Sequence, residues 1–172
     1  MHPDRDRGTE RMATARRTDR TTVTAGHREL RVIFPSDSLS VRDALASTLR
    51  GLRHLELSDD EASTVELVLA EVLNNIVEHA YSGRSERMIE LQVRHDADGL
   101  SCATFDDGDP LPGLQVPPGP TPRPDAPTDL LQEGGFGWFL IRELSSDLSY
   151  HREEGRNHLS FRLDVARQIR TM

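Results

Sequence analysis

The chain has 172 residues, 35% of them hydrophobic, and a formal net charge of −8 at pH 7. This length fits a single domain with a full hydrophobic core, so one fold and one site are expected. No apolar run approaches the roughly 18 residues of a membrane-spanning helix, and the charged N-terminus lacks the apolar segment of a secretory signal. The clustered positive charge with which proteins bind nucleic acid is also missing. We therefore expect a soluble, cytoplasmic protein that binds neither membrane nor nucleic acid directly.

The basic residues narrow the chemistry further, because all 21 of them are arginine. Without lysine the chain cannot use a P-loop, the strand lysine of the protein-kinase fold or a Schiff base. The single cysteine, Cys102, lies in an apolar, strand-like run, where a buried and inert thiol is expected. No role in the site is assigned to it.

The N-terminal segment differs in composition from the rest of the chain. Residues 1–26 carry six arginines, four acidic residues and almost no large apolar side chain. Such a segment cannot bury enough surface to offset the cost of ordering, so a disordered tail is predicted there and one folded domain over 27–172. The domain begins with a strand near 28–34, where RELRVIF ends at Pro35, and a helix follows over 38–52.

A long helix is predicted over 59–81. Ser58 and Glu61 form an S-x-x-E capping box just before and within its first turn. Apolar residues recur along the helix at helical spacing, namely Val65, Leu69, Val72, Ile76 and Ala80. This stripe is expected to face the core.

The second half of the chain predicts two hairpins. Strands at 88–95 and 100–106 flank Asp98-Gly99, which is a strong hairpin signal. A closing hairpin over 147–165 is turned by EEGRN.

The segment between the hairpins has an unusual composition. Residues 107–133 hold eight of the ten prolines and predict a long, mobile lid, after which a helix starts near Gly137. The order is therefore β, α, α, β, β, lid, α, β, β. Hairpins beside amphipathic helices predict an α/β fold of the two-layer α+β type, with a mixed, mostly antiparallel sheet and helices on one face.

Polar residues recur every fourth position on the long predicted helix. Glu71, Asn75 and His79 form one ridge beside the apolar stripe, and a solvated helix face is the simplest interpretation of it. Asn74 and Asn75, however, lie in the apolar stretch LVLAEVLNNIVEHAY, and a carboxamide buried there needs a hydrogen-bond partner. A metal ion or a ligand can supply that partner.

A second candidate segment, FDDGDPLP, directly follows a predicted strand. Turn chemistry alone explains its Asp, Gly and Pro residues. In a functional interpretation, Asp106 accepts a hydrogen bond from an exocyclic amine, and Gly108 leaves room for a planar ring. Adenine fits that description.

The third candidate segment is EGGFGWFLIREL, in which the glycines at 134, 135 and 137 directly precede a helix. Exposed amides at a helix N-terminus suit phosphate, and the same glycines also suit a hinge for the lid. A Rossmann site is excluded, because a proline-rich loop precedes the glycines and Leu140 occupies the third glycine position.

Taken in order, these segments resemble the motifs of the GHKL ATPase superfamily. They read Glu71-x-x-x-Asn75, Asp106-x-Gly108-x-Pro110 and Gly134-Gly135-x-Gly137. Within the superfamily, residues 28–164 resemble the small anti-sigma factor serine/threonine kinases through AEVLNNIVEHAY, DDGDPLP and GGFGWFLIRELSSDLSYHREEGRNHLSF. The HAY sequence and the terminal hairpin, with Gly155 and Asn157, are features of this branch.

The resemblance implies a Bergerat ATP-binding fold with a flexible lid, and ATP and Mg²⁺ as cofactors. It implies Glu71 as the general base or positioning carboxylate, Asn75 as the Mg²⁺ ligand and Asp106 as the adenine-binding residue. The other nucleotide-binding positions are His79, Gly108, Pro110, Arg123, Gly134, Gly135, Phe136 and Gly137. The chain departs from the family pattern at Trp138, where smaller aliphatic residues are usual, and in a lid whose single basic residue is Arg123.

The same resemblance implies a partner switch. The protein would phosphorylate a STAS-domain anti-sigma factor antagonist, sequester a sigma factor or another output regulator, and form a homodimer. The main alternative is a regulatory module that binds ATP and inhibits a partner without phosphorylating it, but Glu71 favours the kinase because binding alone needs no base. A detached histidine-kinase domain is disfavoured, because no dimerising helix pair with an acceptor histidine precedes the strand at 28–34.

Overall fold

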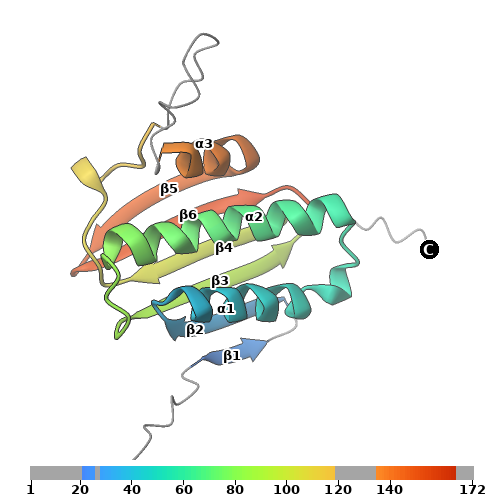
Figure 1. The fold of residues 1–172 in the computed structure, drawn as a ribbon. Helices are drawn as coiled ribbons and strands as arrows, with labels where there is room; N and C mark the ends of the chain where they lie inside the picture. Colours follow the sequence, from blue (N-terminus) through green and yellow to red (C-terminus); the bar gives the residue numbers. More distant parts are fainter. Residues whose placement is uncertain (1–20, 26–27, 119–134, 166–172) are drawn as a thin grey trace, which may run out of the picture.

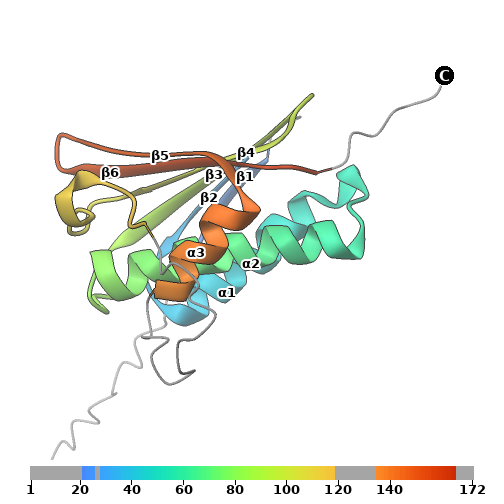
Figure 2. The same ribbon diagram turned by 90° about the horizontal axis from the view of Figure 1, so that it is seen from above.

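The computed structural model describes residues 21–25, 28–118 and 135–165. It shows two layers, a six-stranded sheet and three helices that cover one of its faces (Figures 1 and 2). The helices are α1 Ser38–Gly51, α2 Asp59–Asn75 and α3 Gly135–Leu144. This confirms the predicted α/β class.

The strands are β1 Thr22–Ala25, β2 Glu29–Pro35, β3 Met88–Asp96, β4 Gly99–Asp106, β5 Ser146–Glu153 and β6 Arg156–Leu163. Their order across the sheet is β1-β2-β3-β4-β6-β5, and every neighbouring pair is antiparallel. The parallel component of the predicted mixed sheet is therefore wrong for the described strands. Two helices, rather than a single crossover helix, connect β2 to β3, so the chain re-enters the sheet in the opposite direction.

Strand β1 corrects the predicted extent of the N-terminal tail. Thr22–Ala25 lies within the segment expected to be disordered, yet it pairs with β2 from Thr22 opposite Ile33 to Ala25 opposite Leu30. All four residues are exposed, so backbone pairing at the sheet edge, rather than burial, accounts for this strand. Residues 1–20 of the predicted tail lie outside the described part.

The capping box predicted for the long helix is present. The Ser58 hydroxyl accepts from Glu61 N, and the Glu61 carboxylate accepts from Ser58 N at 2.8 Å. The helix then continues as a π-helical turn, η2 Ile76–Ala80. Residues 59–80 of the predicted span are thus helical, with a change in winding after Asn75.

Both predicted hairpins are confirmed. In the first, Asp96 pairs with Gly99 across a tight turn. In the closing hairpin Glu153 pairs with Arg156, and the two turn residues, Glu154 and Gly155, have φ of 50° and 79°.

The core fills the space between the sheet and the helices. The predicted stripe, except for the partly buried Ala80, is buried there, together with Phe34 of β2, Leu91 of β3 and Phe161 of β6. Cys102 is buried among them, and burial raises the pKa of its thiol to about 12, as expected for an inert cysteine. Two short 3-10 turns complete the fold, η1 Arg53–Leu55 and η3 Pro112–Leu114. None of the described helices has the length and apolarity needed to cross a membrane.

Candidate functional site

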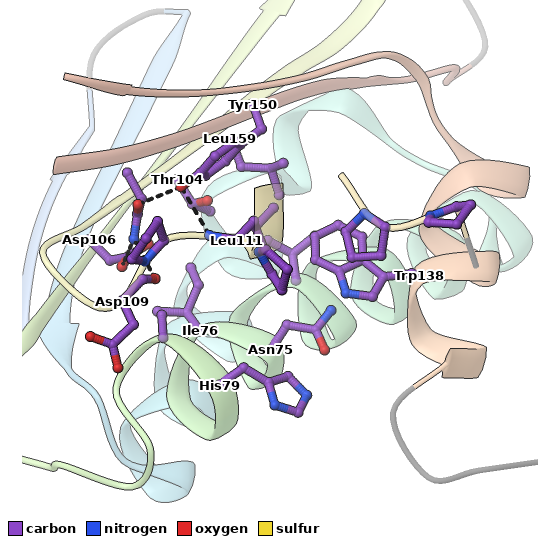
Figure 3. Close-up of a pocket in the computed structure, with 17 residues that line it drawn as sticks. Asn75, Ile76, His79, Thr104, Asp106, Asp109, Leu111, Trp138, Tyr150 and Leu159 are labelled. Carbon is purple, nitrogen blue, oxygen red and sulfur yellow. Dashed lines mark hydrogen bonds between the residues drawn. The ribbon is translucent and has the colours of Figure 1, made fainter. Parts of the chain in front are cut away.

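A cavity of about 500 Å³ opens between the end of α2, the strands β4 and β6, the segment after β4 and helix α3 (Figure 3). Its polar lining consists of Asn75, His79, Thr104, Asp106, Asp109, Tyr150 and Asn157. Its apolar walls include Val72, Ile76, Leu111, Trp138, Leu159 and the prolines at 110, 112, 117 and 118. A mostly apolar pocket with a few convergent polar groups is typical of a small-molecule site.

The π-helical turn shapes one wall of this cavity. Tyr81 N donates to Ile76 O at 2.9 Å, a bond that spans five residues and widens the helix. Ile76 remains in the core, while His79, one turn after Asn75, is exposed at the rim of the cavity. The irregular turn therefore lies directly beside two of the predicted site residues.

Two polar atoms in the cavity wall lack partners among the described residues. They are Nδ2 of Asn75 and Oγ1 of Thr104, both buried. Buried polar groups in folded proteins are almost always hydrogen-bonded, because leaving one unpaired costs about 1–3 kcal/mol. The two atoms lie on opposite walls of the cavity (Figure 3).

Glu71 lies beside the cavity and does not line it. Its Oε2 approaches helix α3 so closely that a Cβ atom added at Gly137 would stand 2.5 Å from it, and 3.9 Å from Nδ2 of Asn75. Gly137 is helical and half-buried, so the close approach of the carboxylate, not an unusual φ, requires glycine. The predicted base and the predicted metal ligand thus both face the first turn of α3.

Asp106, at the end of β4, is only 6% exposed and is fixed by two donors. Asn157 Nδ2 donates to its Oδ1 at 2.7 Å, and Gly108 N donates to the same oxygen at 2.9 Å. Burial raises the pKa of Asp106, while these two hydrogen bonds lower it. No donor among the described residues reaches Oδ2, so that oxygen is available to accept a hydrogen bond from a ligand.

Gly108 lies against the end of the π-helical turn. A Cβ atom there would stand 2.5 Å from Ala80 O and 2.6 Å from Ala80 C, which belong to rigid backbone. Asp109 N donates to the same Ala80 carbonyl at 2.7 Å. The glycine therefore lets the segment after β4 pack directly on the helix.

The Tyr81 hydroxyl ties the site to the sheet. It donates to Met88 O and accepts from Asp107 N, both at 2.8 Å, and burial raises the pKa of Tyr81 to about 12. The hydroxyl thus stays protonated and holds the residue after Asp106 in place. Farther along, Arg142 of α3 donates to the carbonyls of Val116 and Pro117, which anchors the start of the predicted lid.

The structure places four of the predicted site residues in the lining of this cavity. Asn75, His79, Asp106 and Pro110 line it, with Gly108 directly behind. Gly135 begins α3, whereas Phe136 is 51% exposed, stacks on Phe139 and does not line the cavity. Arg123 and Gly134 lie outside the described residues, as does the lid beyond residue 118.

Several residues that line the cavity or contact its lining are not predicted from the sequence as site residues. Thr104 precedes Asp106 by two positions, so strand periodicity alone places it on the same face. Asn157 belongs to the features that the family branch shares, but its position opposite Asp106 depends on the register of β4 with β6. Tyr150 and Arg152 alternate on β5 toward Asn157. No local sequence signal identifies these last contacts.

Comparison with known proteins agrees with this geometry. Residues 34–163 match the histidine kinase-like ATPase domain family. The chain is 35% identical to the serine/threonine-protein kinase BtrW of Bordetella bronchiseptica over 130 residues, which cover 71% of this chain and 87% of the relative. It is 28% identical to the serine-protein kinase RsbW of Oceanobacillus iheyensis over 111 residues, which cover 63% of this chain and 70% of that relative.

A solved structure shares the fold. The crystal structure of the RsbU and RsbW domains of Rv1364c from Mycobacterium tuberculosis superposes with a TM-score of 0.57 and 15% identity, covering 81% of this chain. This chain spans only 33% of that longer chain. The match to the family over most of the sequence, together with the identity to BtrW, confirms the resemblance found in the motifs. The chain belongs to the histidine kinase-like (GHKL) ATPase family, in its branch of anti-sigma factor serine/threonine protein kinases.

Proposed function

We propose that this kinase transfers the γ-phosphoryl group of ATP to a serine or threonine of a STAS-domain anti-sigma factor antagonist. When that antagonist is not available, the protein sequesters a sigma factor or a similar output regulator, and the two activities together form a partner switch in the cytoplasm. The observation that best supports this proposal is that Asn75 and Asp106 line one cavity while Glu71 lies beside Asn75 at the first turn of α3.

Asp106 is the residue we assign to the adenine end of the nucleotide. Its Oδ2 can accept from the exocyclic amine, and Gly108, which packs on Ala80, donates its N–H to the other oxygen. Apolar contacts to the ring come from Ile76 and Leu159. The cavity volume of about 500 Å³ is within the usual range for small-molecule sites.

The phosphate end is assigned to the first turn of α3, which begins at Gly135. Free amides and the helix dipole favour negative charge there, and Gly137 carries no side chain that would block it. We also propose phosphate contacts from Gly134, which precedes this turn, and from Arg123 in the predicted lid.

The residues present also fit Mg²⁺. The described part of the chain holds no cluster of three or more His, Cys, Asp or Glu side chains, so the protein itself offers no metal cage. A magnesium ion bound to a nucleotide needs only one or two protein ligands, because phosphate oxygens and water complete its coordination. Asn75 would offer its carbonyl oxygen to the metal, and its buried Nδ2, which has no partner among the described residues, would be left to donate to a phosphate oxygen. Mg²⁺ bound with ATP would neutralise charge on the phosphates during transfer.

Glu71 is assigned to the acceptor hydroxyl. Its carboxylate lies beside the first turn of α3 and outside the cavity, so a partner serine or threonine can reach it without displacing the nucleotide. In that position it orients the hydroxyl and accepts its proton. Phosphoryl transfer depends mainly on such positioning and on charge neutralisation.

The proposal is tested by incubating the full chain with γ-labelled ATP, Mg²⁺ and a purified STAS-domain protein. The expected product is an acid-stable, base-labile phosphate ester on the STAS-domain protein. Glu71→Gln should retain ATP affinity within about threefold and lower transfer by about 10²- to 10⁴-fold, the usual contribution of a general base. Glu66→Gln, an exposed position on the same helix, is the matched control.

Two outcomes would change the proposal. Tight ATP binding without transfer to any STAS-domain protein would support the regulatory module that inhibits without phosphorylating. Unchanged transfer by Glu71→Gln would remove the base role. Sequestration is checked by gel filtration with a sigma factor, which should co-elute with the kinase and be released when the unphosphorylated antagonist is added. The elution volume of the kinase alone reports whether it is a homodimer.

A further inference from the structure

We propose that Asn157 is a positioning residue that makes the site selective for a purine with a 6-amino group, because it fixes which oxygen of Asp106 faces the nucleotide. This inference rests on the proposed nucleotide-binding function and assigns a new residue to it. Asn157 lies on β6 directly opposite Asp106 on β4, and it is only 4% exposed.

The orientation of the Asn157 amide is determined by its surroundings. Its Oδ1 accepts from the Tyr150 hydroxyl at 2.7 Å and from Arg152 Nη1 at 2.5 Å. Arg152 can only donate, so a flipped amide would place an N–H group against its guanidinium. The Nδ2 group therefore has to face Asp106.

The Nδ2 group, in turn, fixes the carboxylate. It donates to Asp106 Oδ1 at 2.7 Å and also contacts the carbonyl oxygen of Asp109 at 3.1 Å. Because Gly108 N donates to the same Oδ1, that oxygen is already saturated. Oδ2 then remains as an acceptor for the ligand. An acceptor at this point binds the N–H of a 6-amino group and repels the oxygen of a 6-oxo purine such as guanine.

The protonation of Asp106 depends on the hydrogen bond from the Asn157 amide. Burial and the neighbouring Asp107 raise the pKa of Asp106, whereas Asn157, Gly108 N and Arg152 lower it. The Tyr81 hydroxyl nearby stays neutral, since its pKa is about 12. Without the amide donor the pKa of Asp106 rises further, and a protonated carboxyl would donate where the wild type accepts.

The test compares the affinities for ATP and for purine riboside 5′-triphosphate, which lacks the 6-amino group, by titration calorimetry on the full chain. The wild type should prefer ATP by about 10- to 100-fold, as expected for a buried hydrogen bond to a charged group. Asn157→Ala should reduce this preference to within about threefold while changing the affinity for the analogue much less. Ser160→Ala, on the opposite face of β6, should leave both affinities unchanged.

Three further measurements separate positioning from a structural role. In an Asp106→Asn background, Asn157→Ala should have no additional effect on the ATP preference. When Asn157→Ala is the only substitution, the fall in ATP affinity on acidification should begin at a higher pH than in the wild type. Asn157→Asp keeps an acceptor for Tyr150 and Arg152 and removes the N–H donor to Asp106. It therefore tests the role of that donor even if Asn157→Ala fails to fold. At pH 8 this variant should also lose the preference for ATP over the analogue.

An equal loss of affinity for both nucleotides in Asn157→Ala and Asn157→Asp would overturn the inference, because it would indicate a general disturbance of the cavity. A preference for ATP that survives in both variants would overturn it as well. Failure of the wild type to bind any nucleotide would instead contradict the proposed function, and the two failures are therefore distinguishable.

Discussion

The carboxylate of Glu71 on α2 lies against the backbone of Gly137 on α3, so closely that a Cβ atom at position 137 would stand 2.5 Å from Glu71 Oε2. The two helices therefore contact through a glycine at the point where the proposed catalytic residue is placed. Because the atom in the way is the end of a flexible side chain, a larger residue at 137 would move the carboxylate rather than break the fold.

Gly137→Ala tests this relationship. Alanine is favoured over glycine inside a helix by about 0.8–1.0 kcal/mol, so the thermal midpoint should stay the same or rise. Transfer should nevertheless fall by about 10- to 100-fold, because a shift of about 1 Å in a catalytic group is costly. Single-turnover transfer and thermal melts measure the two effects.

Glu143→Ala, an exposed substitution in the last turn of the same helix, is the control for Gly137→Ala and should change neither quantity appreciably. If Gly137→Ala lost stability and activity together, the contact with Glu71 would not be the reason for the glycine.

Asn75→Ala should remove the protein ligand proposed for Mg²⁺. Mg·ATP affinity is expected to drop by at least about 100-fold, since both a metal ligand and a buried amide are lost. Asn74→Ala changes the same residue type one position away, outside the cavity lining, and should stay within about threefold of the wild type.

Calorimetry with Mg²⁺ and with EDTA distinguishes the role of Asn75 in binding metal from a role in shaping the pocket. In EDTA the difference between Asn75→Ala and the wild type should shrink markedly. A difference of equal size with and without the metal would show that Asn75 is not a metal ligand.

Glu90 predicts how stability depends on pH. This carboxylate is 7% exposed on the uncovered face of the sheet. It accepts from Arg31 at 2.6 Å, from Gln92 at 2.7 Å and from Arg156 at 2.7 Å. The hydrogen bond from Arg31, followed by those from Gln92 and Arg156, lowers the pKa of Glu90 to about 2.

Because the folded pKa of Glu90 is below its ordinary value of 4.5, its contribution to stability is fully present above pH 4.5 and is lost as the pH falls toward 2. We expect about 1–3 kcal/mol from this group. Urea midpoints measured at pH 5, 4 and 3 should fall less steeply for Glu90→Gln than for the wild type. Glu29→Gln, which breaks the exposed ion pair of Glu29 with Arg94, should change the slope little. Parallel slopes for Glu90→Gln and the wild type would contradict the assignment.

Local signals in the sequence determined much of the fold. Ser58 and Glu61 marked the start of α2, because a capping box acts within one helical turn. The EEGRN turn was recognisable because Gly155 adopts a positive φ that few other residues tolerate. The helix spacing of Asn75 and His79, and the position of Asp106 at a strand end, are equally local. The order of the three motifs then sufficed to identify the family.

Tertiary structure decided the contacts between segments far apart in the chain. Asp106 and Asn157 are separated by 51 positions in the chain. Only the pairing of β6 with β4 brings Asn157 Nδ2 to 2.7 Å from Asp106 Oδ1, and the same pairing places Leu159 and Phe161 in the core. The same holds for Glu71 and Gly137, which the packing of α3 on α2 brings together. Strand β1 also depended on a partner, since its exposed residues carry no burial pattern. The sequence by itself determined which residues have the right chemistry, because turns, caps and periodicity act over a few residues; only long-range burial decided which of them meet.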